Sequence, residues 1–150
     1  MFERRSDGSY TLHLSEDDRR FLASLADELG RVLTDEPDDP SLRRLFPPAY
    51  PDDVAREAGY QMLMGDELRS SREHALALLR ETTERTELSE EEVTGWIQAV
   101  NSLRLVLGTR LDVSEDDDAE PPAEDDPQAR AKLVYHYLGV VLERAVDGLA

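Results

Sequence analysis

The 150-residue chain is long enough to bury one substantial core, and its 39% hydrophobic but only 6% aromatic content is typical of a helical protein. Its formal net charge of −17 disfavours binding to nucleic acid through a general basic surface. The absence of cysteine excludes disulfides, thiolate metal sites and a cysteine nucleophile within these residues. No apolar run approaches the roughly 20 residues that span a bilayer, and no secretory signal is present, so we expect a cytoplasmic protein.

The N-terminal segment predicts a β-hairpin. Tyr10, Leu12 and Leu14 alternate with polar residues, and the turn-forming tetrapeptide 6–9 separates them from residues 2–5. Two strands alone are only marginally stable in water. The hairpin is therefore expected to lie on the helices or to pair with another chain.

A first helix is predicted to begin after Ser15, which precedes an acidic opening turn, and to end near Leu33. The residues of its apolar stripe are Leu22, Leu25, Leu29 and Val32. A short helix over 41–46 follows an acidic loop, and Pro47 and Pro48 end it because proline lacks an amide donor and clashes with the preceding turn.

The next helical segment is predicted to begin at residues 52–53 and to reach about Met64. The residues expected to face inward are Val54, Ala58 and Met62. Gly65 is expected to break or kink the helix. Helical spacing resumes over 66–85, where the residues predicted to face the core are Leu68, Ala75, Leu76 and Leu79.

The strongest helix signal covers residues 88–111. Ser89 is a typical N-cap, and the three glutamates that follow lie where the helix dipole favours negative charge. Apolar residues then recur at three- and four-residue spacing, namely Val93, Trp96, Ile97, Val100, Leu103, Leu107 and Leu111. Leu105 and Val106 fall outside this stripe, so the second half is apolar nearly all round and predicts a central, buried helix.

A flexible acidic linker is predicted at residues 113–127, because nine acids and no base lie between 112 and 126. The last helix is expected from about Pro127 to Leu149. Its predicted apolar face consists of Val134, Tyr137, Leu138, Val141, Ala145 and Val146. The predicted fold class is mainly α, with one domain formed by a bundle of four to five helices and a small N-terminal β-hairpin.

Two arginines inside the apolar part of the central helix form the first candidate site. Arg104 and Arg110 lie six residues apart and do not share one helix face. Either guanidinium could anchor a carboxylate or phosphate, which gives the alternative function of a small-molecule (anion) binding protein or enzyme. The favoured interpretation is structural: a partly buried arginine paired with an acid, and Asn101 as an interior polar group that needs partners. The candidate acids are Asp53, Asp66 and Glu67.

No catalytic residues, cofactor site or metal site are predicted. The histidines lack the spacing of a helical metal site, and they are His13, His74 and His136. The eight glycines build no phosphate-binding loop, and the serines at helix starts are explained by capping. We therefore expect that the chain is not an enzyme.

Three arginine pairs, at 4–5, 19–20 and 43–44, are the local argument for nucleic-acid binding. Acids accompany each pair and no recognition helix is evident, so direct DNA binding is disfavoured. Trp96 and Tyr50 are candidate interface anchors, although Trp96 lies on the apolar stripe of a core helix.

Three segments resemble an actinobacterial family of domains of unknown function: 44–50 (RLFPPAY), 96–111 and 134–138. The sequence LRLVLGTRL at 103–111 is the most specific part, and the resemblance extends over essentially the whole chain. Genes of this family often lie beside the Clp-protease adaptor ClpS and a cysteine-synthesis cluster that uses a ubiquitin-like sulfur carrier. Members are labelled transcriptional regulators linked to oxidative-stress control of cysteine synthesis. The resemblance implies a regulatory protein that acts through protein partners.

A thiol-based sensor cannot operate within these residues, because they include no cysteine. Oxidation of Met62 or Met64 is a chemical alternative, but core packing is the favoured explanation for both. The sequence thus predicts a non-enzymatic regulatory or adaptor protein that contains no cofactor and does not contact membranes. We expect a homodimer, with partners from the transcription machinery or among Clp components.

Overall fold

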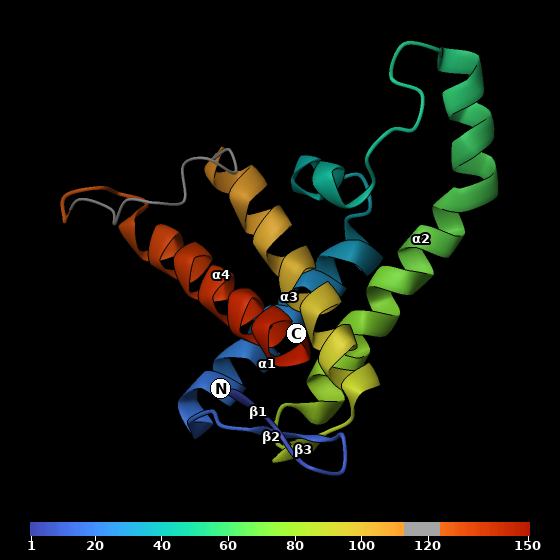
Figure 1. The fold of residues 1–150 in the computed structure, drawn as a ribbon. Helices are drawn as coiled ribbons and strands as arrows, with labels where there is room; N and C mark the ends of the chain where they lie inside the picture. Colours follow the sequence, from blue (N-terminus) through green and yellow to red (C-terminus); the bar gives the residue numbers. More distant parts are fainter. Residues whose placement is uncertain (113–123) are drawn as a thin grey trace.

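The computed structural model describes residues 1–112 and 124–150 and shows a helical body with a small sheet at one end (Figure 1). Its helices are α1 (Glu16–Asp35), the 3-10 helix η1 (Pro40–Leu45), α2 (Val54–Thr82), α3 (Glu90–Leu111) and α4 (Ala129–Leu149). Its strands are β1 (Phe2–Arg4), β2 (Tyr10–Leu12) and β3 (Glu87–Leu88). The predicted mainly α class with an N-terminal hairpin is confirmed. Most of the predicted linker, residues 113–123, lies outside the described residues.

The hairpin pairs within its own chain. β1 and β2 are antiparallel, with Phe2 opposite Leu12, and β2 pairs in turn with β3, with Tyr10 opposite Leu88. The sequence did not indicate this third strand. The sheet lies on the helices, as expected, because Phe2 meets Trp96 of α3 edge to face with ring centroids 5.8 Å apart.

Helix α3 lies at the centre of the core, as its apolar sequence predicted. It packs against α4, α2 and η1, and half of its residues are buried, including Trp96 and Val106. A capping box fixes its start: the Ser89 hydroxyl accepts from the Glu92 amide at 3.1 Å, and the Glu92 carboxylate accepts from the Ser89 amide at 2.9 Å. α2 approaches closely at Gly95, where an added Cβ would lie 2.8 Å from Cδ2 of Leu78.

The last helix packs mainly on α3 and the first mainly on α2, and each buries much of its predicted apolar stripe. α1 begins at the Ser15 cap, whose hydroxyl accepts from the Asp18 amide at 3.1 Å. The buried residues of these helices are Leu22, Ala26, Leu29, Val32 and Leu33 in α1 and Tyr135, Leu138, Val141 and Ala145 in α4. Val146 was predicted on the inner face of α4, but it is 48% exposed.

Helix α2 differs from the sequence prediction in two respects. It continues through Gly65 without a break as one helix of 29 residues. The prediction that Val54, Ala58 and Met62 face the core is wrong, because Val54 is 87% exposed, Met62 is 86% exposed and Ala58 is also exposed. Core packing therefore does not explain Met62, and Met64 is only half-buried. The buried residues of α2 all belong to its second half: Ala75, Leu76, Leu79 and Thr82.

Candidate functional site

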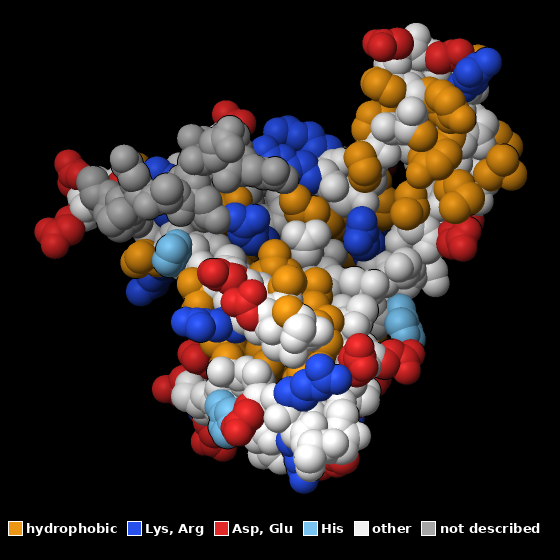
Figure 2. Space-filling view, viewed as in Figure 1, with side chains coloured by type: hydrophobic (Ala, Val, Ile, Leu, Met, Phe, Trp, Pro, Cys, Tyr) orange, Lys and Arg blue, Asp and Glu red, His pale blue; other side chains and the backbone are white. Residues whose placement is uncertain are grey.

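The first half of α2, residues 54–68, projects from the helical body and is called the arm below (Figure 1). Figure 2 shows hydrophobic side chains over much of its surface. Four of the seven large hydrophobic residues that are exposed in the described chain lie on the arm or in the loop before it. These are Tyr50, Val54, Met62 and Leu63. The arm is therefore the main concentration of uncovered apolar surface in the part of the chain that the structure describes.

Two arginines just C-terminal to the arm fix α2 to the body. The guanidinium of Arg69 donates to the Leu33 carbonyl at 2.7 Å and lies 6.0 Å from the centroid of the Phe46 ring. One turn later, Arg72 donates to the Leu45 carbonyl at 3.4 Å. These contacts join α2 to the end of α1 and to η1. The helix N-terminal to Arg69 extends beyond them.

The loop before α2 packs on the outer turns of the arm. The Tyr50 amide donates to the Glu57 carboxylate at 2.9 Å, and the Tyr50 ring meets the Tyr60 ring edge to face at 6.4 Å. Arg56 lies 5.9 Å from the centroid of the Tyr50 ring. Gln61 and the Tyr50 amide hold the pKa of the Glu57 carboxyl below its ordinary value. Tyr50, a predicted interface anchor, remains 42% exposed at the arm.

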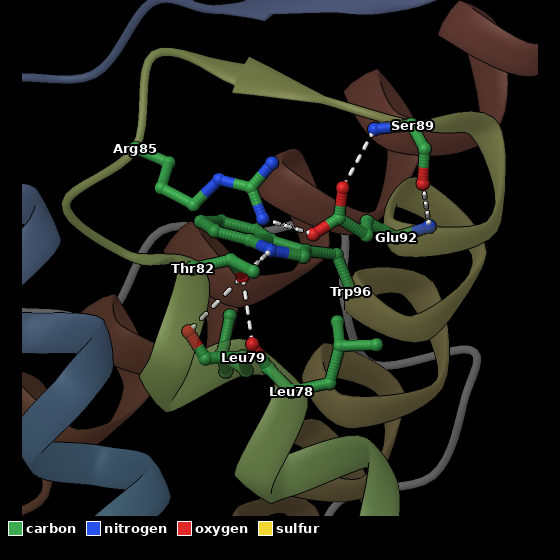
Figure 3. A network of polar contacts seen from close by, with 7 residues as sticks. All are labelled: Leu78, Leu79, Thr82, Arg85, Ser89, Glu92 and Trp96. Atoms are coloured by element: carbon green, nitrogen blue, oxygen red, sulfur yellow. Dashed lines mark hydrogen bonds and ion pairs between the residues drawn. The ribbon is translucent and has the colours of Figure 1, made fainter.

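Trp96, the other predicted interface anchor, is fully buried between α2 and α3 (Figure 3). Its indole N–H donates to the Thr82 hydroxyl at 2.7 Å, and that hydroxyl donates to the Leu78 carbonyl at 2.7 Å. Both groups thereby find partners inside the core. Trp96 stabilises the fold and presents no surface to a partner.

The same close-up shows the polar contacts among Arg85, Ser89 and Glu92 at the start of α3 (Figure 3). Burial alone would raise the pKa of Glu92, but the Ser89 amide and hydroxyl and the Arg85 guanidinium lower it below its ordinary value. The carboxylate is thus ionised at neutral pH and holds the Ser89 amide and Arg85 together.

Arg104 and Arg110, the first candidate site, occupy different surroundings. The Arg104 guanidinium lies 4.6 Å from the centroid of the Tyr135 ring on α4, a cation–π contact that the sequence did not indicate. Arg110 is exposed and lines a mostly apolar hollow of about 80 Å³ between α1, α3 and α4. Ligand pockets commonly measure about 300–1,000 Å³, so this hollow is too small for most metabolites. Asn101 is half-buried on α3.

Arg19, considered in the sequence only as half of an arginine pair, has a structural role. Its guanidinium donates to the carbonyls of Leu12, Leu14, Thr83 and Arg85 at 2.6–3.1 Å. These bonds join β2 and the start of α1 to the turn between α2 and β3. A short-range sequence pattern could not show this role, because the acceptors are backbone carbonyls up to 66 residues away.

The described residues show no group of three or more His, Asp or Glu side chains arranged to hold a metal ion. No helix in the described part of the chain is both long and apolar enough to cross a membrane. The arm is thus the feature of this structure that most needs a functional explanation.

Comparisons with known proteins give one family and several named relatives. The model of a domain of unknown function (DUF2017) matches residues 1–149. The chain is 32% identical over 152 residues to proteins named oxidative stress regulator AosR from Mycobacterium bovis and Mycobacterium tuberculosis, which covers 86% of this chain and 69% of each relative. A Mycobacterium leprae relative is 34% identical over 130 residues, and the match spans 75% of this chain but only 59% of that relative. No solved structure shows a significant match.

Proposed function

The chain belongs to the DUF2017 family, and from this premise we propose that it is a non-enzymatic regulatory protein that acts through protein-protein contacts. The mycobacterial relatives named oxidative stress regulators support a role in the response to oxidants. The proposal includes transcriptional control of cysteine synthesis, with partners in the transcription machinery or among Clp components. It also assigns the chain to the cytoplasm.

The arm is the observation that carries this proposal. Val54, Met62 and Leu63, the last 81% exposed, remain uncovered on the arm, although the loop before α2 packs on other residues of it. Burying each such side chain in a complex would contribute about 1.5–3 kcal/mol. An isolated helix of this length is only marginally stable in water, so the arm depends on the second half of α2 for its order. A rigid apolar helix held away from the body is well suited to dock on a partner protein.

The experiment compares a strain that lacks this gene with its parent before and after exposure to peroxide. We expect the transcriptional response to peroxide, including that of the cysteine-synthesis genes, to be reduced in the deletion strain and restored by the wild-type gene. The same response in both strains would refute the regulatory role.

A further inference from the structure

The arm is acidic as well as apolar. Residues 52–67 contain five acids and one base, Arg56. Asp66 and Glu67 are both exposed near the middle of α2. A partner that covers the arm should therefore combine apolar contacts with positive charge.

The body of the same chain carries positive charge beside η1. Arg43 lies in the last turn of η1, is exposed, and forms no ion pair within the described residues. Arg110, in the last turn of α3, is also exposed. Helix α3, which carries Arg110, packs against η1, which carries Arg43. Figure 2 shows Lys and Arg side chains gathered on the side of the body next to the arm.

The arm cannot cover this arginine face of its own chain. α2 is one continuous helix that Arg69 and Arg72 fix to the body, and bending it would break its backbone hydrogen bonds. A second copy has no such restriction. A second copy has the same arginine face, which can receive the arm of the first copy, and the same exposed arm, which can lie on the face of the first copy.

We propose that the partner of the arm is a second copy of this chain, with each arm lying over the η1–α3 arginine face of the other copy around a two-fold axis. This inference rests on the proposed function and assigns a partner to the same contact surface. The two contacts are identical by symmetry, so the assembly closes at two copies. The ridge formed by Val54, Ala58 and Met62 at four-residue spacing supplies the apolar side of each contact.

The dimensions of the arm agree with a stable pair. A helix of about 15 residues is about 22 Å long, and half of its accessible surface is about 450 Å². Two arms and the two surfaces that receive them would bury about 1,800 Å² in total, within the usual range of about 1,200–2,000 Å² for specific interfaces.

Charge reversal combined with sedimentation velocity tests the proposal on the purified full chain. We expect the wild type to form a dimer between about 1 and 100 μM. The arm variant Asp66→Arg/Glu67→Arg and the face variant Arg43→Glu/Arg110→Glu should each weaken the dimer at least about tenfold. An equimolar mixture of the two should form dimers again, because both contacts then join opposite charges.

Apolar variants provide an independent test. Val54→Lys/Met62→Lys on the arm should also give monomers, whereas Val146→Lys on an exposed part of α4 should remain dimeric. Circular dichroism checks that each variant is folded. A wild type that stays monomeric over the whole range, or a mixture that fails to form dimers, would overturn the proposal. Neither result would affect the proposed function, because the transcript experiment does not depend on the oligomeric state.

Discussion

The buried contact between Trp96 and Thr82 permits the most direct prediction of stability. Thr82→Val keeps the size and branching of the side chain but removes the oxygen that accepts from the indole N–H at 2.7 Å. Both residues are buried, so water cannot replace the lost acceptor. The cost should therefore be that of an unsatisfied buried donor.

The expected loss is about 1–3 kcal/mol in the free energy of unfolding. For a chain of this size, each kcal/mol lowers the melting temperature by about 2–4 °C, so Tm should fall by about 2–12 °C. Thr83→Val is the matched control. Thr83 is equally buried, but its hydroxyl only donates to the Arg80 carbonyl at 3.2 Å, so its removal should cost no more than about 1 kcal/mol.

Urea denaturation followed by the fluorescence of Trp96, the single tryptophan, measures both variants. The midpoint should fall for Thr82→Val while the denaturant slope stays unchanged, because the exposed surface on unfolding is the same. Equal unfolding free energies for Thr82→Val and Thr83→Val would refute the assigned role of the indole bond.

Three further predictions concern α2 and α3. Leu63→Ala should change the unfolding free energy of dilute protein by less than about 0.5 kcal/mol, because Leu63 is exposed. Leu79→Ala, on the buried half of the same helix, should lower it by about 2–5 kcal/mol. Equal losses for the two variants in urea titrations would show that Leu63 is packed and would contradict the exposed arm. The folded-state pKa of Glu92 lies below 4.5, so its stabilising effect is present above pH 4.5 and is lost as the pH falls through the folded value. Glu92→Gln should therefore lose less stability than the wild type between about pH 6 and pH 3, and equal acid sensitivity in thermal melts would contradict this. Dilute peroxide should oxidise Met62 before the half-buried Met64, and peptide mass mapping that found Met64 oxidised first would oppose the exposed arm.

The sequence predicted those elements whose signals are local. Ser89 and the glutamates after it marked the start of α3, and the capping box is present. Leu105 and Val106 lie outside the apolar stripe, so this segment is apolar nearly all round and was predicted to form a central, buried helix. Ser15 similarly marked the start of α1.

The arm could not be predicted, because periodicity shows which residues share a helix face but not whether another element covers that face. Val54, Ala58 and Met62 have the spacing of an inward stripe and are nevertheless exposed. Strand β3 was missed for a different reason: two residues are too few to show alternation. Its signal was indirect, since a lone hairpin needs a further partner.

The candidate site was predicted only in part. Tyr50 lies at the arm, but Trp96 belongs to the core, and Arg104 lies on the Tyr135 ring. A side chain such as Trp96 suits a core and an interface equally well, so its sequence position alone does not separate the two. The importance of residues 54–68 became evident only from the exposure of Val54, Met62 and Leu63 in the structure.

Complementation of a strain that lacks the gene tests most directly whether the arm is the contact surface that the function requires. The wild-type gene and the Val146→Lys control should both restore survival in peroxide. Val54→Lys/Met62→Lys, confirmed as folded and expressed at the wild-type level, should fail to do so. Full restoration by this arm variant would contradict the assignment of function to the arm.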